Sequence, residues 1–403
     1  MSSYERQQMK ATLQPGPRLV RQIRPTNILS FGPDTEALPL ESLNVLIGPN
    51  GAGKSNLIEV LTLLQACPTD LREAVRRGGG VADWIWKGAS AKAASVEAVV
   101  EYGFDRSMNL RHLIEFEESN HTFRLAGERI EYASRDSSDP EEYVYRYQNG
   151  MGYFRKGGSK DRQHRSSVEA SASIISQRRD PEGFPEISHL AESYRRMSIY
   201  REWTFGRNTV IRSPQKADLR KDRLEEDFSN LGLFLSRLRF NPKAKADLLT
   251  GLRDLYEGVN DFELDPSGGT VQVHFIEDRA SIPATRLSDG SLRYLCLLAI
   301  LCDPEPPPLI CIEEPELGLH PDILPKLADL LVAASERTQL IVTTHSDILV
   351  DAMTERPEAV VVCEKHDGQT TMKRQRKEDL AVWLGKYRLG QLWTKGQIGG
   401  TRW

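Results

Sequence analysis

The stretch GPNGAGKS at residues 48–55 constrains the fold more than any other feature of this 403-residue sequence. An apolar run, LNVLI, precedes it, and a helix-forming run, SNLIEVL, follows it. A glycine-rich loop between a strand and a helix lets backbone N–H groups surround an anion, and the helix N-terminus adds its dipole. The spacing matches the G-x-x-x-x-G-K-[ST] pattern of loops that cradle nucleotide phosphates. The sequence therefore predicts a strand–loop–helix unit that binds the phosphates of a nucleotide.

The residues of this loop have separate expected roles. Lys54 is expected to reach the β- and γ-phosphates, and Ser55 is expected to hold Mg²⁺ through its hydroxyl. The predicted ATP-binding residues are Gly48, Pro49, Asn50, Gly51, Ala52, Gly53, Lys54, Ser55 and Asn56.

Two adjacent glutamates end a second apolar run, in LICIEEPELGLHP at residues 309–321. The run predicts a strand that is buried on both faces, and carboxylates at its end are costly unless a cation or donors meet them. Mg²⁺ held by Ser55 and the ATP phosphates would offset Glu313, directly or through water. Glu314 is then placed to orient or deprotonate an attacking water.

Two polar turns complete the candidate site. QLIVTTHSDIL at 339–349 ends a further buried strand, and the ends of parallel strands gather at one edge of a sheet, so His345 is expected beside Glu314 and the γ-phosphate. TRLSDGSLRY at 285–294 opens an apolar helix. Ser288 can cap that helix or present its hydroxyl and nearby amides to a phosphate. The position of this turn shortly before the acidic strand favours the second role.

The composition excludes a globally basic protein, because the net charge is −4 and 27% of residues are charged. The five cysteines show no metal-ligand spacing, which favours buried thiols in a reducing cytosol. The N-terminus has no apolar signal core, and the longest apolar stretch, LCLLAILC, is too short to span a bilayer. We expect a soluble, cytoplasmic protein that does not associate with membranes.

The four motifs GPNGAGKS, LSDGS, LICIEEPELGLHP and TTHS, in this order, resemble those of the ABC-type ATPase heads of the SMC, RecF and OLD-like group. They are most similar to the AAA_21 and AAA_15 predicted ATPases of bacterial defence systems. The resemblance covers most of the chain and is specific at 40–65 and 285–351. It implies an α/β P-loop NTPase of ABC type, with a mostly parallel sheet, an antiparallel β portion and an inserted helical lobe.

Five segments follow from this resemblance and from the pattern of apolar residues. They are a flexible tail at 1–18; a first part of the ATPase lobe with the phosphate loop at 19–103; a β and helical insertion at 104–284; the signature helix, Walker B strand and His switch at 285–365; and a C-terminal hairpin with a Trp/Gly tail at 366–403. The hairpin prediction rests on strand alternation around the Asp-Gly turn at 367–368. A nuclease centre at Glu364 and Asp367 is the less favoured interpretation.

The resemblance also implies a mechanism. Two heads would pair head-to-tail and enclose two ATP molecules with Mg²⁺, and LGLHP would correspond to the family's D-loop between the two sites. The implied catalytic residues are Glu314, His345 and Lys54. The partner chain would supply the trans signature residues Ser288, Asp289, Gly290 and Ser291. LSDGS departs from the common LSGGQ at Asp289, whose carboxylate would lie near the incoming nucleotide.

The implied metal ligands are Ser55, Glu313 and a glutamine of the family's Q-loop. Gln177, in SIISQRRD, is the candidate for this glutamine, because it follows the first-lobe strands and precedes the helical region. Gln65 is interpreted as the end of the phosphate-loop helix.

The chain has no apparent effector module. Only some fifty residues follow TTHS, which is too short for a Toprim nuclease, and no sustained apolar heptads predict coiled-coil arms. The resemblance therefore favours the ATPase component of a two-gene anti-phage system, with a separate nuclease or Toprim-like effector. One alternative is a RecF-like clamp that binds nucleic acid through Arg155, Lys156, Lys160, Arg162 and Arg165. Another is a nucleotide-dependent scaffold with negligible turnover.

Overall fold

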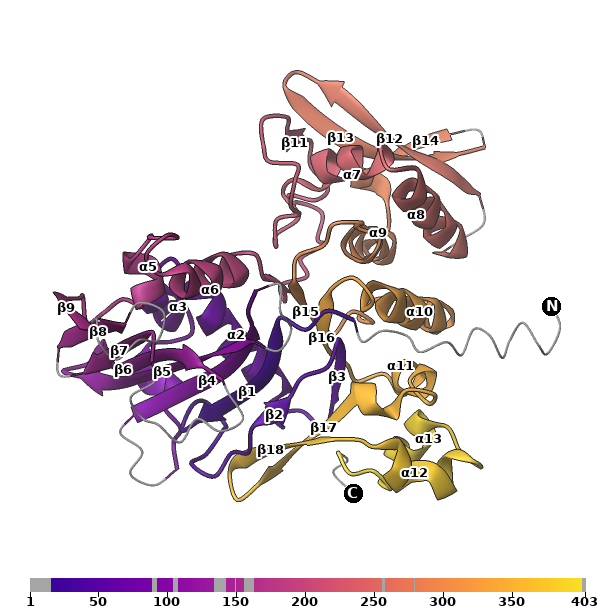
Figure 1. Cartoon of the computed structure of the whole chain (residues 1–403). Coiled ribbons are helices and arrows are strands. Elements are labelled where there is room, and N and C mark those ends of the chain that lie inside the picture. The colour runs from indigo at the N-terminus through magenta and orange to yellow at the C-terminus, as the bar shows by residue number, and fades with distance from the viewer. Residues whose placement is uncertain are drawn as a thin grey trace.

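The computed structural model describes residues 16–88, 93–103, 108–133, 143–148, 150–155, 163–255, 258–278 and 280–400 (Figure 1). Its centre is a six-stranded sheet, in which every neighbouring pair is parallel except the last. In spatial order the strands are β10 (Ser198–Tyr200), β15 (Leu309–Glu313), β16 (Gln339–Thr343), β3 (Leu43–Ile47), β17 (Val360–His366) and β18 (Gln369–Arg374).

The central strands are continuously apolar because both faces of the sheet are buried. In β15, Ile310 and Ile312 pack into one hydrophobic core, and Leu309 and Cys311 pack into the other. The first core contains helices α9 (Asp289–Leu301), α10 (Leu324–Ala334) and α11 (Asp347–Ala352). The second contains α2 (Lys54–Ala66) and α6 (Pro185–Arg195). The predicted mostly parallel α/β sheet is confirmed.

An antiparallel sheet of eight strands covers the face of α2 that lies away from the central sheet (Figure 1). It runs through the predicted boundary at 103/104, because β4 pairs with β5 across it. In spatial order its strands are β2 (Leu38–Pro39), β1 (Val20–Thr26), β4 (Ala93–Glu101), β5 (Asn109–Ser119), β6 (Thr122–Tyr132), β7 (Tyr145–Gln148), β8 (Met151–Arg155) and β9 (Gln163–Ser167). The segment that holds the basic residues of the alternative clamp, 154–167, contains the end of β8 and all of β9.

A second lobe stands above the signature helix in Figure 1. Helices α7 (Leu231–Arg239) and α8 (Pro242–Leu255) both contact α9 and pack against a small antiparallel sheet. The strands of that sheet are β11 (Gln215–Lys216), β12 (Val259–Ser267), β13 (Thr270–Glu277) and β14 (Ala280–Pro283). The range 104–284 is therefore divided among three places, since it also contributes β10 to the central sheet.

The C-terminal hairpin forms as predicted: β17 pairs with β18, and His366 faces Gln369 across the Asp-Gly turn. Glu364 accepts a hydrogen bond from Gly400 N at 2.9 Å. Helices α12 (Lys377–Leu384) and α13 (Leu389–Thr394) follow, and the buried Trp393 donates to Gly400 O at 3.0 Å. Trp403 and residues 1–15 lie outside the described residues.

The remaining helical segments are short. They are α3 (Leu71–Arg77), α4 (Val81–Trp84), α5 (Ile174–Gln177) and the 3-10 turns η2 (Ala284–Arg286), η3 (Pro321–Ile323) and η4 (Pro357–Ala359). Within the described ranges, no helix has both the length and the apolar character needed to cross a bilayer. All five cysteines are buried and free.

Candidate active site

The phosphate loop joins β3 to α2 and depends on glycine. Gly48 has φ +145°, and a Cβ at this position would lie 2.2 Å from the carbonyl oxygen of Cys363 in β17. Gly53, the residue before α2, has φ +97°, and a Cβ there would lie 2.2 Å from Thr370 Oγ1 in β18. Both glycines are therefore required by conformation and by space. The hairpin β17–β18 forms one wall of the loop.

Lys54 is buried at the first position of α2 and points back over the loop. Its Nζ donates to the carbonyls of Gly48 and Pro49 at 2.8 and 3.1 Å. Burial lowers the pKa of Lys54, while Cys363 and the nearby carboxylates, Glu314 first among them, oppose this shift. The structure thus brings the ammonium group of the loop and the acidic end of β15 into one electrostatic environment.

Glu313 and Ser55 are in direct contact. The Ser55 hydroxyl donates to the Glu313 carboxylate, and Trp203 Nε1 donates to the Glu313 carbonyl at 2.8 Å. A hydroxyl and a carboxylate are the oxygen ligands that Mg²⁺ uses beside phosphate oxygens, without a protein-only cage. Consistently, no group of three or more metal-ligating side chains occurs among the described residues. The pair fits Mg²⁺ that is held jointly with a nucleotide.

Glu314 has φ +46°, a left-handed conformation that costs a non-glycine residue about 1–3 kcal/mol. Its N–H donates to both the carbonyl and the Oγ1 of Thr343, each at 3.1 Å. The turn aims the carboxylate at His345, whose Nε2 lies 3.4 Å from Glu314 Oε1. Backbone strain of this kind concentrates at functional sites.

His345 is held by Glu316, a residue that the sequence reasoning did not assign. Glu316 Oε1 accepts from His345 N and from Thr344 Oγ1, both at 2.7 Å. Burial lowers the pKa of His345 below 6.5, and Lys54 lowers it further, while Glu314 and Glu316 oppose the shift. Burial thus favours the neutral imidazole. The signal for Glu316 was its place in EEPE, directly after the paired glutamates.

The signature turn lies at the start of α9. Ser288 Oγ accepts from Ser291 N at 3.0 Å, so the predicted cap is present. Gly290 lies against the D-loop, since a Cβ here would lie 2.8 Å from Gly318 O. Ser288 is exposed, and no hydrogen bond or ion pair among the described residues joins the turn to the phosphate loop. In Figure 1 the two are on different parts of the head.

Asp289 has a partner that the sequence did not suggest. Its carboxylate accepts from Arg212, whose buried guanidinium also donates to the carbonyls of Phe205, Ala284 and Leu287. The side chain of Arg212 is 7% exposed, whereas that of Asp289 is 67% exposed. The charge that distinguishes LSDGS from LSGGQ is thus balanced within the same chain.

The structure does not bring Gln177 to the site. Its Oε1 accepts from Glu169 N at 2.8 Å, and its Nε2 donates to Glu169 O and Ala172 O, so both ends of the amide are bound within its own turn. Figure 1 places α5 beside β8 and β9, away from β15. Gln65 donates to Met197 O and Glu226 and takes no part in the site.

Arg201, which the sequence did not suggest, lies beside the predicted metal ligand Glu313. It directly follows β10, the strand beside β15, and its Nε lies 3.1 Å from Glu313 Oε2. The signal in the sequence was SIYRE at 198–202, whose first three residues form β10, a strand too short to be recognised beside longer helices.

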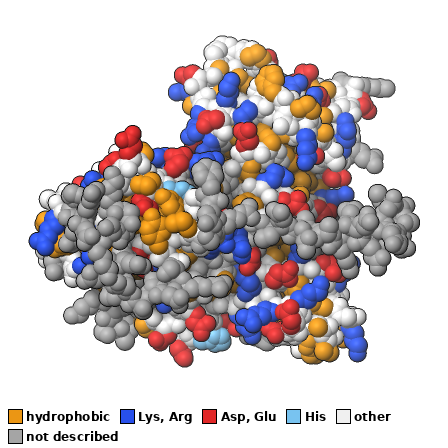
Figure 2. Space-filling model, in the orientation of Figure 1, with side chains coloured by type: hydrophobic (Ala, Val, Ile, Leu, Met, Phe, Trp, Pro, Cys, Tyr) orange, Lys and Arg blue, Asp and Glu red, His pale blue; other side chains and the backbone are white. Residues whose placement is uncertain are grey.

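The basic residues assigned to a nucleic-acid clamp do not form an exposed cluster in the described part of the chain. Arg155 is buried in β8 and lies 4.5 Å from the ring centre of Tyr143, which corrects its expected exposure. Arg165 is exposed, and Lys156, Lys160 and Arg162 lie outside the described residues. Figure 2 shows basic and acidic side chains interspersed over the described part of the face in view.

Comparison with known proteins agrees with this geometry. A family model described as "AAA_21: AAA domain, putative AbiEii toxin, Type IV TA system" matches residues 43–351. The chain is 34% identical to the chromosome partition protein Smc of Cereibacter sphaeroides over 89 residues. These residues make up 22% of this chain. The match spans only 8% of that relative's length.

Two solved structures show the fold. One is an Smc head bound to the C-winged helix domain of ScpA, with TM-score 0.59 and 15% identity, covering 90% of this chain and 99% of that one. The other is an Smc head with an extended coiled coil, bound to the C-terminal domain of ScpA, from Pyrococcus furiosus. It has TM-score 0.56 and 13% identity, and covers 91% and 99% of the two chains. The predicted ABC-type head fold is confirmed.

Proposed function

This chain belongs to the AAA_21 family and has the fold of SMC-type ATPase heads, and from this premise we propose that it binds ATP with Mg²⁺ and hydrolyses it to ADP and phosphate. One observation carries the proposal. The ends of β3, β15 and β16 bring Lys54, Ser55, Glu313, Glu314 and His345 together at one edge of the central sheet.

The side chains divide the work. The amides of the phosphate loop and Lys54 bind the phosphates, and Ser55 and Glu313 would hold the metal. Mg²⁺, when bound, would offset the charge that develops on the transferred phosphoryl group. Glu314 takes a proton from the attacking water or orients it, and neutral His345 donates a hydrogen bond to the γ-phosphate.

The site requires a second copy of the chain to be complete. Ser288 is exposed at the start of α9 and is not bonded to the phosphate loop of its own chain. Two heads that pair head-to-tail would place Ser288 and Gly290 of each on the ATP of the other. The close approach of Gly290 to Gly318 supports communication between the two sites, because the signature turn and the D-loop are in backbone contact.

His345 is expected to act as a neutral donor. Because its pKa lies below 6.5, the folded protein binds fewer protons at this position than an exposed histidine would, and the ring charges only as the pH falls further. At pH 7.5, His345→Gln should keep most of the hydrolysis rate, whereas His345→Ala should lose about 10²-fold. An NMR titration of His345 with a midpoint at or above 6.5 would contradict this role.

We further propose that the head controls a separate effector, in a bacterial anti-phage system. The described residues have the fold of an ATPase head, no group of three or more His, Cys, Asp or Glu side chains among them is placed to hold a metal ion, and the family description names a toxin–antitoxin system. The purified chain with ATP and Mg²⁺ is therefore expected to leave DNA and RNA intact. Cleavage by the wild type that is lost in identically purified Lys54→Ala would belong to this chain rather than to a contaminating nuclease, and would refute the proposal. Affinity purification from the native host should identify the effector.

A further inference from the structure

Arg201 joins two carboxylates at the edge of the metal site. Its Nε lies 3.1 Å from Glu313 Oε2, and its NH1 contacts Glu59 of α2 in a second ion pair. Glu313 also accepts from Ser55 through its other oxygen. Both carboxylate oxygens of Glu313 therefore have a protein donor, and one of these donors carries a full positive charge.

This arrangement competes with metal binding. The donor set for Mg²⁺ is the hydroxyl of Ser55 and the carboxylate of Glu313, and Arg201 holds the same carboxylate. The guanidinium is always protonated, so it cannot leave by losing its charge. A dication and a guanidinium beside one carboxylate repel each other, and the repulsion is strong where water is partly excluded. The side chains of Glu313, Glu59 and Arg201 are 16%, 20% and 30% exposed.

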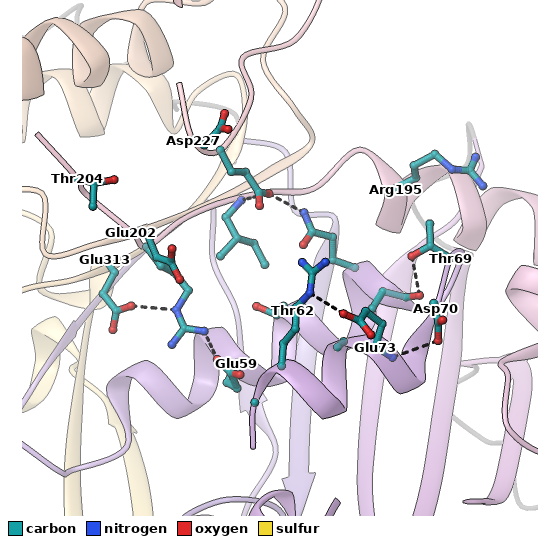
Figure 3. Close-up of a pocket in the computed structure, with 18 residues that line it drawn as sticks. Glu59, Thr62, Thr69, Asp70, Glu73, Arg195, Glu202, Thr204, Asp227 and Glu313 are labelled. Carbon is teal, nitrogen blue, oxygen red and sulfur yellow. Dashed lines mark hydrogen bonds and ion pairs between the residues drawn. The ribbon is translucent and has the colours of Figure 1, made fainter. Parts of the chain in front are cut away.

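The space for an alternative position of Arg201 is present. A cavity of about 990 Å³ extends from Glu313 along α2, and Arg201 lines it. Figure 3 shows Glu313 and Glu59 at one end of this cavity and Asp70 and Glu73 at the other. Glu202, next to Arg201 in sequence, also lines it. The guanidinium can therefore release Glu313 and remain bound to Glu59 or approach another carboxylate.

We propose that Arg201 is a positioning residue that acts as an internal counter-ion for Glu313. Without Mg²⁺ it holds the carboxylate in place against Ser55. When Mg²⁺ enters with a nucleotide, the Arg201–Glu313 ion pair breaks and the Arg201–Glu59 ion pair remains. The chain therefore binds nucleotide only above a Mg²⁺ concentration that is set by the strength of the Arg201–Glu313 pair. This inference rests on the proposed binding of ATP and Mg²⁺.

A Mg²⁺ titration of nucleotide binding tests the competition. The full-length protein is mixed with a fluorescent, slowly hydrolysed ATP analogue, and the half-saturating Mg²⁺ concentration is measured. Arg201→Gln should lower this concentration on the order of tenfold. Arg201→Lys should lower it less, because it keeps the charge but loses the planar fork that spans two carboxylates. Glu59→Gln should raise the half-saturating Mg²⁺ concentration, because Glu313 is then the one remaining ion-pair partner of Arg201 in this pair of carboxylates.

Arg195 is the matched control. It lines the same cavity and pairs with Glu192 at 3.3 Å, so Arg195→Gln removes an equal charge that does not hold Glu313. This control should leave the half-saturating Mg²⁺ concentration unchanged. An unchanged or higher value in Arg201→Gln, or an equal drop in Arg195→Gln, would overturn the inference. If thermal unfolding shows that Arg201→Gln does not fold, the Arg201→Lys titration replaces it. A lower half-saturating Mg²⁺ concentration in Arg201→Lys would then support the inference, and an unchanged or higher one would overturn it. Failure of the wild type to bind the analogue at any Mg²⁺ concentration would instead refute the proposed function.

Discussion

Replacing Glu314 by glutamine should reduce ATP hydrolysis by about 10²–10⁴-fold while leaving ATP binding intact. The amide keeps the size and the left-handed turn of Glu314, and it can still face His345 at the distance seen for the carboxylate, 3.4 Å. It cannot accept the proton of the attacking water. The measurements are steady-state phosphate release and retention of radiolabelled ATP after gel filtration.

Glu316→Gln is the matched control for this prediction. It changes a carboxylate two residues away that binds His345 N and Thr344 Oγ1. A neutral amide oxygen still accepts those two bonds, so the loss of hydrolysis should be much smaller than for Glu314→Gln. Equal rates for Glu314→Gln and wild type would show that Glu314 is not the base.

Mixing two inactive variants should restore hydrolysis. Lys54→Ala removes the ammonium that we propose binds the phosphates in one half-site, and Ser288→Arg places a bulky cation on the surface that we propose faces the partner. Each variant alone should lose about 10²-fold or more, because every site in its dimer is defective. In a mixed dimer, the Ser288→Arg chain supplies Lys54 and Glu314, and the Lys54→Ala chain supplies Ser288. Random pairing should recover about a quarter of the wild-type rate.

The control mixture combines Lys54→Ala with Glu314→Gln. Both substitutions affect the half-site that a chain contributes in cis, so a mixed dimer still contains no complete site and should stay inactive. Two outcomes would contradict a composite site. One is a mixture of Lys54→Ala and Ser288→Arg that is no more active than its parts. The other is full hydrolysis by Ser288→Arg alone.

Motifs at strand ends could be predicted from the sequence because their geometry is local. GPNGAGKS lies between a buried strand and a helix. The parallel sheet then brings the other motifs to this loop, because β16 pairs with both β15 and β3 and the carboxyl ends of the three strands meet. Glu313, Glu314 and His345 were placed beside Lys54 by this reasoning alone. The Asp-Gly hairpin was recognised for a similar reason, since its turn chemistry is contained in two residues.

Partners that are distant in sequence could not be predicted. Arg201 reaches Glu313 across 112 positions, and Arg212 reaches Asp289 across 77. Each arginine lies in a segment without regular structure, and no periodicity reveals where tertiary packing brings such a segment. Gln177 was chosen by its order along the chain, but order does not show that β10, a strand of three residues, takes the place beside β15.

The oligomeric state of Glu314→Gln in ATP tests the central claim most directly. Light scattering after gel filtration should report twice the 45.5 kDa mass of one chain with ATP and Mg²⁺, and 45.5 kDa with ADP or without nucleotide. In the proposed dimer the bound ATP would hold the two heads together through Ser288 and Gly290, and Glu314→Gln would prevent its hydrolysis. A mass that does not change between ATP and ADP, in protein shown to retain ATP, would contradict an ATPase head that closes head-to-tail on its nucleotide.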